Sequence, residues 1–207
     1  IFAVNRIREE AGTSFTSKLE GMFRDVKKSK ELNDEFNGTS KAKAKAKARV
    51  NARARKIEVE KEIESEIENK LELEVNILTS TFWPQSNSRE VDNKIIYPEF
   101  LKVKKDEYNE FYYRKHSGRF LNFTSTFGTM DIKIQFKKKK HEINIPIYGG
   151  LILLLWSEVD QRDCKFTMKE IEEKTMIPRN DLIRNLQGLS VAARTRLLKK
   201  EPPTRGI

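Results

Sequence analysis

The sequence has one cysteine, two histidines and no long hydrophobic run among its 207 residues. A single cysteine excludes a disulfide framework, so we expect an intracellular protein of a reducing compartment, cytoplasmic or nuclear. The longest apolar run, Ile147–Trp156, is too short to cross a membrane and contains two glycines. No signal peptide is visible, so we expect no membrane as a partner. The chain begins at Ile1 rather than Met, so we expect a segment of a longer protein.

Motifs that carry catalysis or hold metals are also missing. The sequence has no glycine-rich phosphate loop, no HExxH helix and no spaced set of Cys and His residues, so we predict no cofactor, no metal and no catalytic residue. Cys164 is expected to be a half-buried packing residue, because no His or second Cys lies near it in sequence. His116 precedes Ser117, but adjacency in sequence is not triad geometry, so we expect it in a turn. We therefore predict that the protein is not an enzyme.

Basic residues exceed acidic ones by 41 to 31, and most of the excess lies in one stretch. Residues 41–56 contain eight basic residues and no acidic one, and without them the formal charge falls from +10 to +2. Residues 57–74 then contain eight glutamates and two lysines. We interpret residues 37–70 as a low-complexity insert, either a solvated helix or disordered. This insert has no aromatic residue for base stacking, which argues against a nucleic-acid tail.

Hydrophobic spacing predicts a helix before the insert. Its apolar face consists of Phe15, Leu19, Met22, Phe23 and Val26. Asp25 is expected to point away from this face, and a second short stripe runs through Leu32 and Phe36. Gly21 lies inside the apolar stripe, which suggests a close contact with another helix or a local break.

After the insert the period changes from helical to two. Residues 71–79 alternate between apolar and polar side chains, which predicts a half-buried strand that ends at Phe82-Trp83-Pro84. Pro98 can open a helix, and Gly118 can end it with a left-handed cap. A hairpin follows, with Met130–Phe136 as one strand and a return strand that runs to Ile147. One helix and about four strands predict a small α+β unit.

The last sixty residues predict three short helices and a strand. Leu151–Trp156 is an apolar helical segment, and Thr167 with Glu170 has the spacing of a capping box at the start of a second helix. Pro178 ends that helix, and a third helix begins near Asn180. Arg196–Lys199 is the candidate strand. This pattern suits a winged helix, a variant of the helix-turn-helix.

Five strings in this order carry a resemblance to a known family. They are TSKLEGMFRDVKKSKELNDEF (16–36), VNILTSTFWP (75–84), FYYRKHSGRFLNF (111–123), DLIRNLQGLS (181–190) and LLKKEP (197–202). Together they resemble the C-terminal half of a cullin. The resemblance spans most of the chain outside the insert, and several matches in register are more specific than one short motif.

The resemblance implies an α+β protein with four segments. Residues 1–36 would end a helical bundle, 37–70 form the insert, 71–147 form a small α/β sheet domain, and 148–207 form a truncated first winged-helix domain. The chain ends at Ile207, before the second winged helix that in this family carries the lysine modified by a ubiquitin-like protein. We therefore expect no such modification site in this segment.

The resemblance also implies a function, that of a non-catalytic scaffold in a cullin-RING ubiquitin ligase for ubiquitin-dependent protein degradation. In this family a RING-box zinc protein adds a strand to the α/β sheet and recruits a ubiquitin-conjugating enzyme, while a substrate adaptor binds the N-terminal half, which we expect outside this segment. Strand addition uses main-chain hydrogen bonds for affinity and side-chain pockets for specificity. We expect the RING-box subunit to contact Leu73, Val75, Ile77, Thr79, Trp83 and Arg119. Arg119 is either an exposed contact or part of a structural ion pair.

The alternative is a winged helix that binds nucleic acid. The net charge of +10 and the positions of Arg179 and Arg184 near the start of the third helix favour it. Asp181 in the same turn argues against it, and a winged fold does not by itself imply DNA binding.

Overall fold

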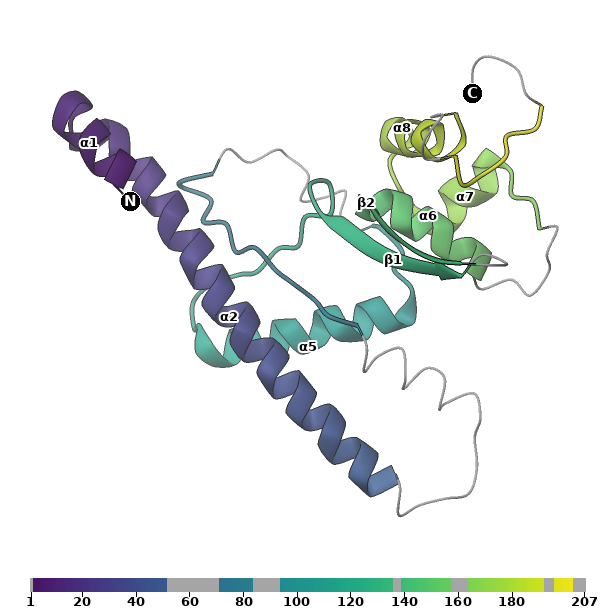
Figure 1. Cartoon of the computed structure of the whole chain (residues 1–207), viewed down its shortest axis with the longest axis horizontal. Coiled ribbons are helices and arrows are strands. Elements are labelled where there is room, and N and C mark those ends of the chain that lie inside the picture. Colours follow the sequence, from purple (N-terminus) through teal and green to yellow (C-terminus); the bar gives the residue numbers. More distant parts are fainter. Residues whose placement is uncertain are drawn as a thin grey trace. The chain divides into compact units, whose positions relative to one another are not determined.

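The computed structural model describes residues 2–51, 71–83, 94–135, 139–157, 164–191 and 196–202. The chain divides into two compact units, shown in Figure 1. One unit comprises Ile1–Ser86 and Phe100–Arg119, and the other comprises Asn87–Glu99 and Phe120–Ile207. The insert beyond Asn51 and the centre of the predicted lysine turn lie outside the described residues. The predicted domain boundaries at residues 36, 70 and 147 stay predictions.

Among the described residues, the first unit contains three helices, α1 (Phe2–Ala11), α2 (Thr13–Asn51) and α5 (Glu99–Lys115). Helix α1 packs against α2 after a break at Gly12. Helix α5 begins directly after Pro98, as predicted. It ends before Gly118, whose φ of 74° is the left-handed conformation expected of a glycine near a helix end. Helix α2 extends through Asn51, so the first part of the proposed insert is helical.

Helix α2 buries a different face from the one that the sequence predicts. Phe23 and Val26 are 53% and 52% exposed, whereas Asp25 is only 8% exposed. The prediction that Asp25 points outward is therefore wrong. Other buried side chains on α2 are Thr16, Ser29 and Phe36, so most of the covered face is small or polar. Its neighbour must therefore supply hydrogen-bonding groups, because buried polar atoms need partners.

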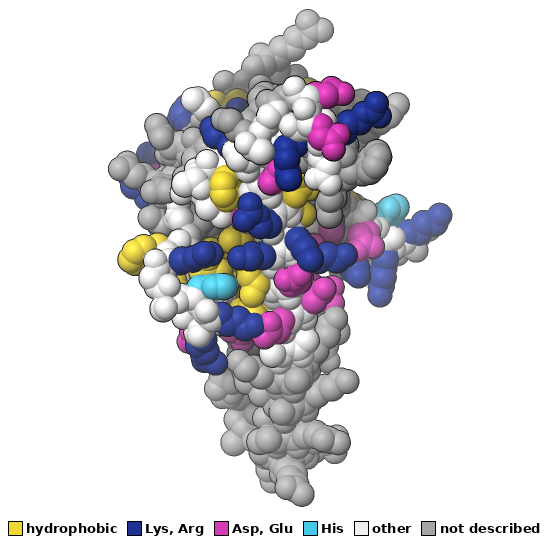
Figure 2. All heavy atoms as spheres, turned by 90° about the vertical axis from the view of Figure 1, so that its left-hand side faces the viewer, with side chains coloured by type: hydrophobic (Ala, Val, Ile, Leu, Met, Phe, Trp, Pro, Cys, Tyr) yellow, Lys and Arg dark blue, Asp and Glu magenta, His cyan; other side chains and the backbone are white. Residues whose placement is uncertain are grey.

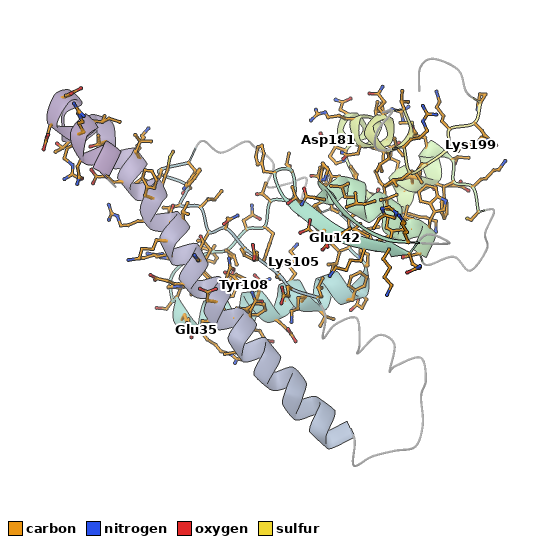
Figure 3. All side chains as sticks on the ribbon, in the orientation of Figure 1. Glu35, Lys105, Tyr108, Glu142, Asp181 and Lys199 are labelled. Atoms are coloured by element: carbon orange, nitrogen blue, oxygen red, sulfur yellow. The ribbon has the colours of Figure 1, made fainter. Side chains whose placement is uncertain are left out.

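The aromatic core of the first unit joins the middle of α2 to α5. The Phe36 ring lies 5.0 Å from the Tyr108 ring in an edge-on contact and 5.5 Å from the Phe111 ring. Tyr108 is fully buried, and this burial raises its pKa to about 12. Figure 3 labels Glu35 on α2, and its carboxylate forms an ion pair with Lys115 of α5. These contacts fix α5 against α2.

The second unit is built on a hairpin of β1 (Thr129–Gln135) and β2 (Lys140–Pro146). The strands are antiparallel, with Met130 opposite Ile145 and Ile132 opposite Ile143, which confirms the predicted hairpin. Helix α6 (Ile147–Ser157) contacts both strands. Ile147 begins this helix, so its placement in the return strand is wrong. Within the described ranges the sheet has two strands rather than about four.

Two further helices, α7 (Met168–Thr175) and α8 (Arg179–Ser190), belong to the second unit. Thr167 and Glu170 form the predicted capping box, and α8 starts directly after Pro178. The predicted strand at Arg196–Lys199 is not observed, because Leu197 and Leu198 both donate their N–H groups to the Leu189 carbonyl. The helices agree with the prediction, and the winged helix stays a prediction. No described helix is both long and apolar enough to cross a bilayer.

Candidate partner-docking site

Residues 71–79 form an extended segment beside α2 in the first unit. Their exposure alternates along the chain: odd-numbered residues are half-buried and even-numbered residues are exposed. This confirms the predicted period of two. The segment pairs with no other strand in the part of the chain that the structure describes, so its assignment to a sheet is wrong there.

Side chains of α2 take the place of a neighbouring strand. Asn33 binds both groups of Val75: its Nδ2 donates to the Val75 carbonyl at 3.1 Å, and its Oδ1 accepts from the Val75 N–H at 3.0 Å. One turn earlier, the Ser29 hydroxyl accepts from the Ile77 N–H at 2.8 Å. Both side chains therefore make the hydrogen bonds that the main chain of a neighbouring strand would make.

Asp25 binds the end of the same segment. Its carboxylate accepts hydrogen bonds from the Thr79 N–H at 2.8 Å, the Thr79 hydroxyl at 2.9 Å and the Trp83 indole N–H at 3.0 Å. One buried carboxylate therefore holds two side chains and one peptide group in place. We call Asp25, Ser29 and Asn33 together the α2 ladder.

The spacing of the α2 ladder follows from the geometry of the two elements. Residues four apart advance about 6.0 Å along a helix axis. Residues two apart advance about 6.6 Å along an extended chain. Because these steps nearly match, three successive turns of α2 meet three alternate peptide groups, with Asn33 at Val75 and Asp25 at Thr79.

Gly21 extends this close contact by one more turn. A Cβ atom added at Gly21 would lie 2.5 Å from the Phe82 ring, so only glycine fits at this point on α2. The close approach predicted at Gly21 is therefore present, but the neighbour is the side chain of Phe82, in the turn that follows the segment, and not another helix.

The opposite edge of the segment points away from α2. Peptide groups of an extended chain alternate between its two sides. Because Val75, Ile77 and Thr79 turn toward α2, the peptide groups of Glu74, Asn76 and Leu78 face the other way. These three residues are exposed, Leu78 at 47%. The segment therefore presents one edge of the kind that accepts an added strand.

Four of the six predicted site residues lie together on the segment, and Trp83 and Arg119 lie outside it. Leu73, Val75, Ile77 and Thr79 follow one another on the half-buried face of the segment. Trp83 lies just beyond them, and its indole N–H is already bound to Asp25. Arg119 is exposed and lies close enough to His116 to affect its pKa.

Sequence reasoning missed the α2 ladder. Its only signal is three polar residues four positions apart, and of these the hydrophobic spacing placed Asp25 alone, away from the apolar face of the helix. Hydrophobic periodicity cannot identify such a face, because the covered partner here is a peptide backbone and not an apolar surface.

His116 lies in the predicted turn after α5. Its backbone N–H donates to the Tyr112 carbonyl at 3.0 Å, and its ring lies 4.6 Å from the Tyr112 ring. Burial and then the charges of Arg119, Lys28 and Lys115 lower its pKa. The lowered pKa favours the uncharged imidazole at neutral pH.

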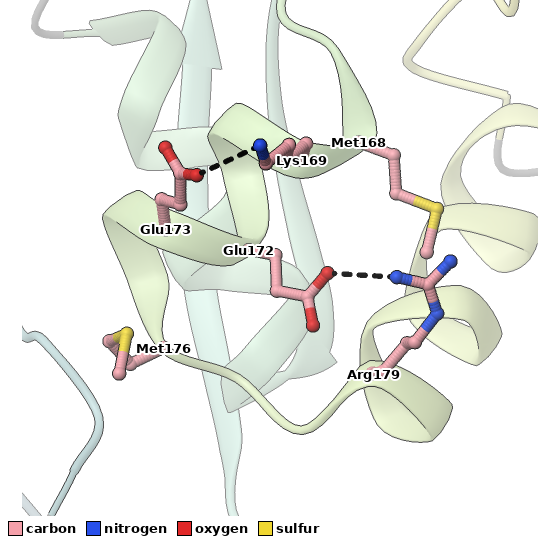
Figure 4. Close-up of a pocket in the computed structure, with 6 residues that line it drawn as sticks. All are labelled: Met168, Lys169, Glu172, Glu173, Met176 and Arg179. Carbon is pink, nitrogen blue, oxygen red and sulfur yellow. Dashed lines mark hydrogen bonds and ion pairs between the residues drawn. The ribbon is translucent and has the colours of Figure 1, made fainter.

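A pocket of about 600 Å³ lies at the turn between α7 and α8 (Figure 4). Met168 and Met176 give it an apolar part. Its charged side chains pair with each other: Glu172 with Arg179 at 3.2 Å, and Lys169 with Glu173 at 3.9 Å. This pairing leaves no strong preference for an anion or a cation. Among the described residues, no group of three or more His, Cys, Asp or Glu side chains could hold a metal ion.

The nucleic-acid alternative is not supported. Arg179 pairs with Glu172, and Arg184 lies 3.6 Å from Asp181 of its own helix. Both arginines that motivated a recognition helix are therefore charge-compensated. The face in Figure 2 likewise shows Asp and Glu side chains next to Lys and Arg.

Comparison with known proteins identifies the family. The model of the Cullin alpha+beta domain matches residues 77–207, and that of the Cullin alpha solenoid domain matches residues 3–33. The chain is 34% identical to Cullin-3 of Schizosaccharomyces pombe over 204 residues, 99% of this chain and 23% of that protein. It is 32% identical to human Cullin-4A and 30% identical to Cullin-3A of Arabidopsis thaliana, covering 96% and 98% of this chain and 22% and 23% of those proteins.

The chain therefore belongs to the cullin family, and its α+β composition fits the matched domain. It spans less than a quarter of the length of these relatives. Two residues of the α2 ladder connect the matched segments. Asp25, in the solenoid match, binds Thr79, in the alpha+beta match, and Ser29 binds Ile77 in the same way.

Proposed function

We propose that this chain is part of a non-catalytic scaffold in a cullin-RING ubiquitin ligase, and that it docks the RING-box subunit by strand addition along residues 73–79. The observation that carries the proposal is the orientation of this segment. The α2 ladder occupies one edge, and the peptide groups of Glu74, Asn76 and Leu78 face away from it.

Strand addition is favourable here because the receiving segment is already ordered. Fixing the backbone of one residue costs about 1–2 kcal/mol of conformational entropy. The α2 ladder already fixes this backbone in the free protein, so the segment does not lose that entropy when a partner binds. The incoming strand then gains main-chain hydrogen bonds on the open edge, and Val75 and Ile77 offer apolar contact beside it. Trp83 supports the segment through Asp25, which gives it an indirect role.

The wider assignments follow from the family. A docked RING-box zinc protein would recruit a ubiquitin-conjugating enzyme, so this chain would position that enzyme without bond chemistry of its own. A substrate adaptor would bind elsewhere in the longer protein. We also propose a winged-helix domain at 148–207, and an intracellular location in the cytoplasm or nucleus.

Co-expression with a RING-box protein, followed by size-exclusion chromatography, is the direct test. We expect the two to co-elute. Replacing Val75 and Ile77 together by Asp should abolish co-elution, whereas deleting residues 41–56 should preserve it. Separate elution of a folded chain and a folded partner would refute the proposal.

A substitution on the open edge gives a sharper test. Asn76→Pro removes the N–H that faces the partner and puts the proline ring in its place, while the α2 ladder stays intact. We expect binding at least about tenfold weaker, equal to about 1.4 kcal/mol. Asn76→Ala keeps the N–H and is the matched control, expected to bind within about twofold of the unchanged chain. Equal affinities for the two variants, with equal thermal stability, would show that this edge is not used.

A further inference from the structure

The α2 ladder fixes the position of the extended segment along its length, and not only its distance from the helix. A strand can slip by two residues and still present the same side-chain face. Such a slip would move the open edge by about 6.6 Å and would change which peptide groups meet a partner.

The contacts of Asp25 exclude a slip. Asn33 and Ser29 bind main-chain groups, which every register offers, so these two residues hold the segment against the helix. Asp25 offers acceptors alone, so it needs several donors, and Thr79 with Trp83 supplies three of them. Shifting the segment by two residues would take both the hydroxyl and the indole N–H away from Asp25.

The two edges of one extended chain share a single register. Once Val75 is opposite Asn33 and Thr79 is opposite Asp25, the positions of the Glu74, Asn76 and Leu78 peptide groups are set as well. A partner strand on the open edge then finds hydrogen-bonding groups at fixed points. Without the α2 ladder, several registers two residues apart would satisfy the same main-chain pattern.

We infer that Asp25, Ser29 and Asn33 are positioning residues that set the register in which a partner strand docks on residues 73–79. This inference rests on the proposed function, since it assigns to α2 the specificity of the same docking edge. The three residues act through the segment, and their side chains need not touch the partner.

Cysteine cross-linking reads the register directly. In a Cys164→Ser background, Asn76→Cys places a thiol on the exposed face of the segment, and single cysteines are moved one position at a time along the N-terminal strand of a RING-box protein. Residues directly opposite each other in paired strands lie about 4.5–5.5 Å apart, a distance that permits a disulfide. We expect one partner position to dominate in the chain with an unchanged α2.

The ladder variants should broaden this pattern. With Asp25→Ala and Ser29→Ala combined, we expect cross-links at positions two residues to either side, and binding weaker by about tenfold. Asp25→Asn should keep the single position, since an asparagine can form the same three contacts with Thr79 and Trp83. Lys30→Ala, on an exposed position of α2, is the control. Trp83→Phe removes a single N–H and tests the same idea if the double variant does not fold.

The outcomes separate the two proposals. A single dominant cross-link and unchanged affinity in the ladder variants would overturn the register inference and leave strand docking intact. An unchanged chain that neither cross-links nor co-elutes with the RING-box protein would refute the docking proposal itself. Cross-links that spread in the folded variants and stay at one position in Asp25→Asn would support the inference.

Discussion

Replacement of Asp25 tests most directly whether its carboxylate holds Thr79 and Trp83 in place. Asp25→Ala removes the acceptor for three hydrogen bonds and leaves the Thr79 and Trp83 N–H groups near an 8%-exposed position. Hydrogen bonds to a charged group contribute about 1.5–3 kcal/mol each, but neighbouring bonds are not additive. We expect the free energy of unfolding to fall by about 3 kcal/mol.

Asp25→Asn distinguishes hydrogen bonding from charge. The carboxylate oxygen Oδ2 accepts from both N–H groups, while Oδ1 accepts from the Thr79 hydroxyl. An asparagine can place its carbonyl oxygen at the first position and donate its amide hydrogen to the hydroxyl oxygen, which can also accept. All three contacts can therefore form, and we expect a loss of less than about 1 kcal/mol.

Urea unfolding followed by Trp fluorescence, with hydrogen exchange at the Thr79 amide, measures both variants. The amide should lose protection in Asp25→Ala and keep it in Asp25→Asn. Equal destabilisation by the two variants would show that the charge matters and the hydrogen-bond pattern does not. A loss below about 1 kcal/mol for Asp25→Ala would refute the view that this carboxylate holds the segment.

Two further predictions concern packing and pH. Gly21→Ala should destabilise the protein by about 1–3 kcal/mol, because its Cβ would lie 2.5 Å from the Phe82 ring. Gly38→Ala has nothing within 4 Å of its Cβ and should gain up to about 1 kcal/mol of helix stability. Thermal unfolding compares the two variants, and a gain in both would contradict the close contact at Gly21. A hydrogen bond from Lys165, followed by one from a second lysine, lowers the pKa of Glu201 to about 2. Its folded pKa is below the unfolded value, so its stabilising contribution is present above pH 4.5 and is lost as the pH falls toward 2. An NMR titration should give a midpoint near pH 2 that rises in Lys165→Ala, and an unchanged midpoint would contradict this cause.

Elements that are specified by local chemistry could be predicted from the sequence. The capping box at Thr167, the start of α5 after Pro98 and the left-handed Gly118 each depend on residues a few positions apart. The hairpin was also predictable, because alternating isoleucines set its register. Such features need no knowledge of distant contacts.

Features that depend on distant partners were predicted less well. The alternation of residues 71–79 was correct, but nothing in a single strand reveals that a helix side chain replaces the neighbouring strand. The same gap explains Asp25, which was assigned to the solvent although it is buried against Thr79. Ile147 continues the period of β2 yet begins α6, because alternation cannot mark where a helix takes over.

The contact between Asn33 and Val75 closes a loop in the chain, since the two residues are 42 positions apart. Loop-closure entropy rises only with the logarithm of length, so doubling such a connection costs about 0.6 kcal/mol. The α2 ladder at the base of the loop therefore keeps the outer edge of residues 73–79 in place when the length of the connection changes. This connection can lengthen at little thermodynamic cost, as long as Asp25, Ser29 and Asn33 still bind the same residues of the extended segment.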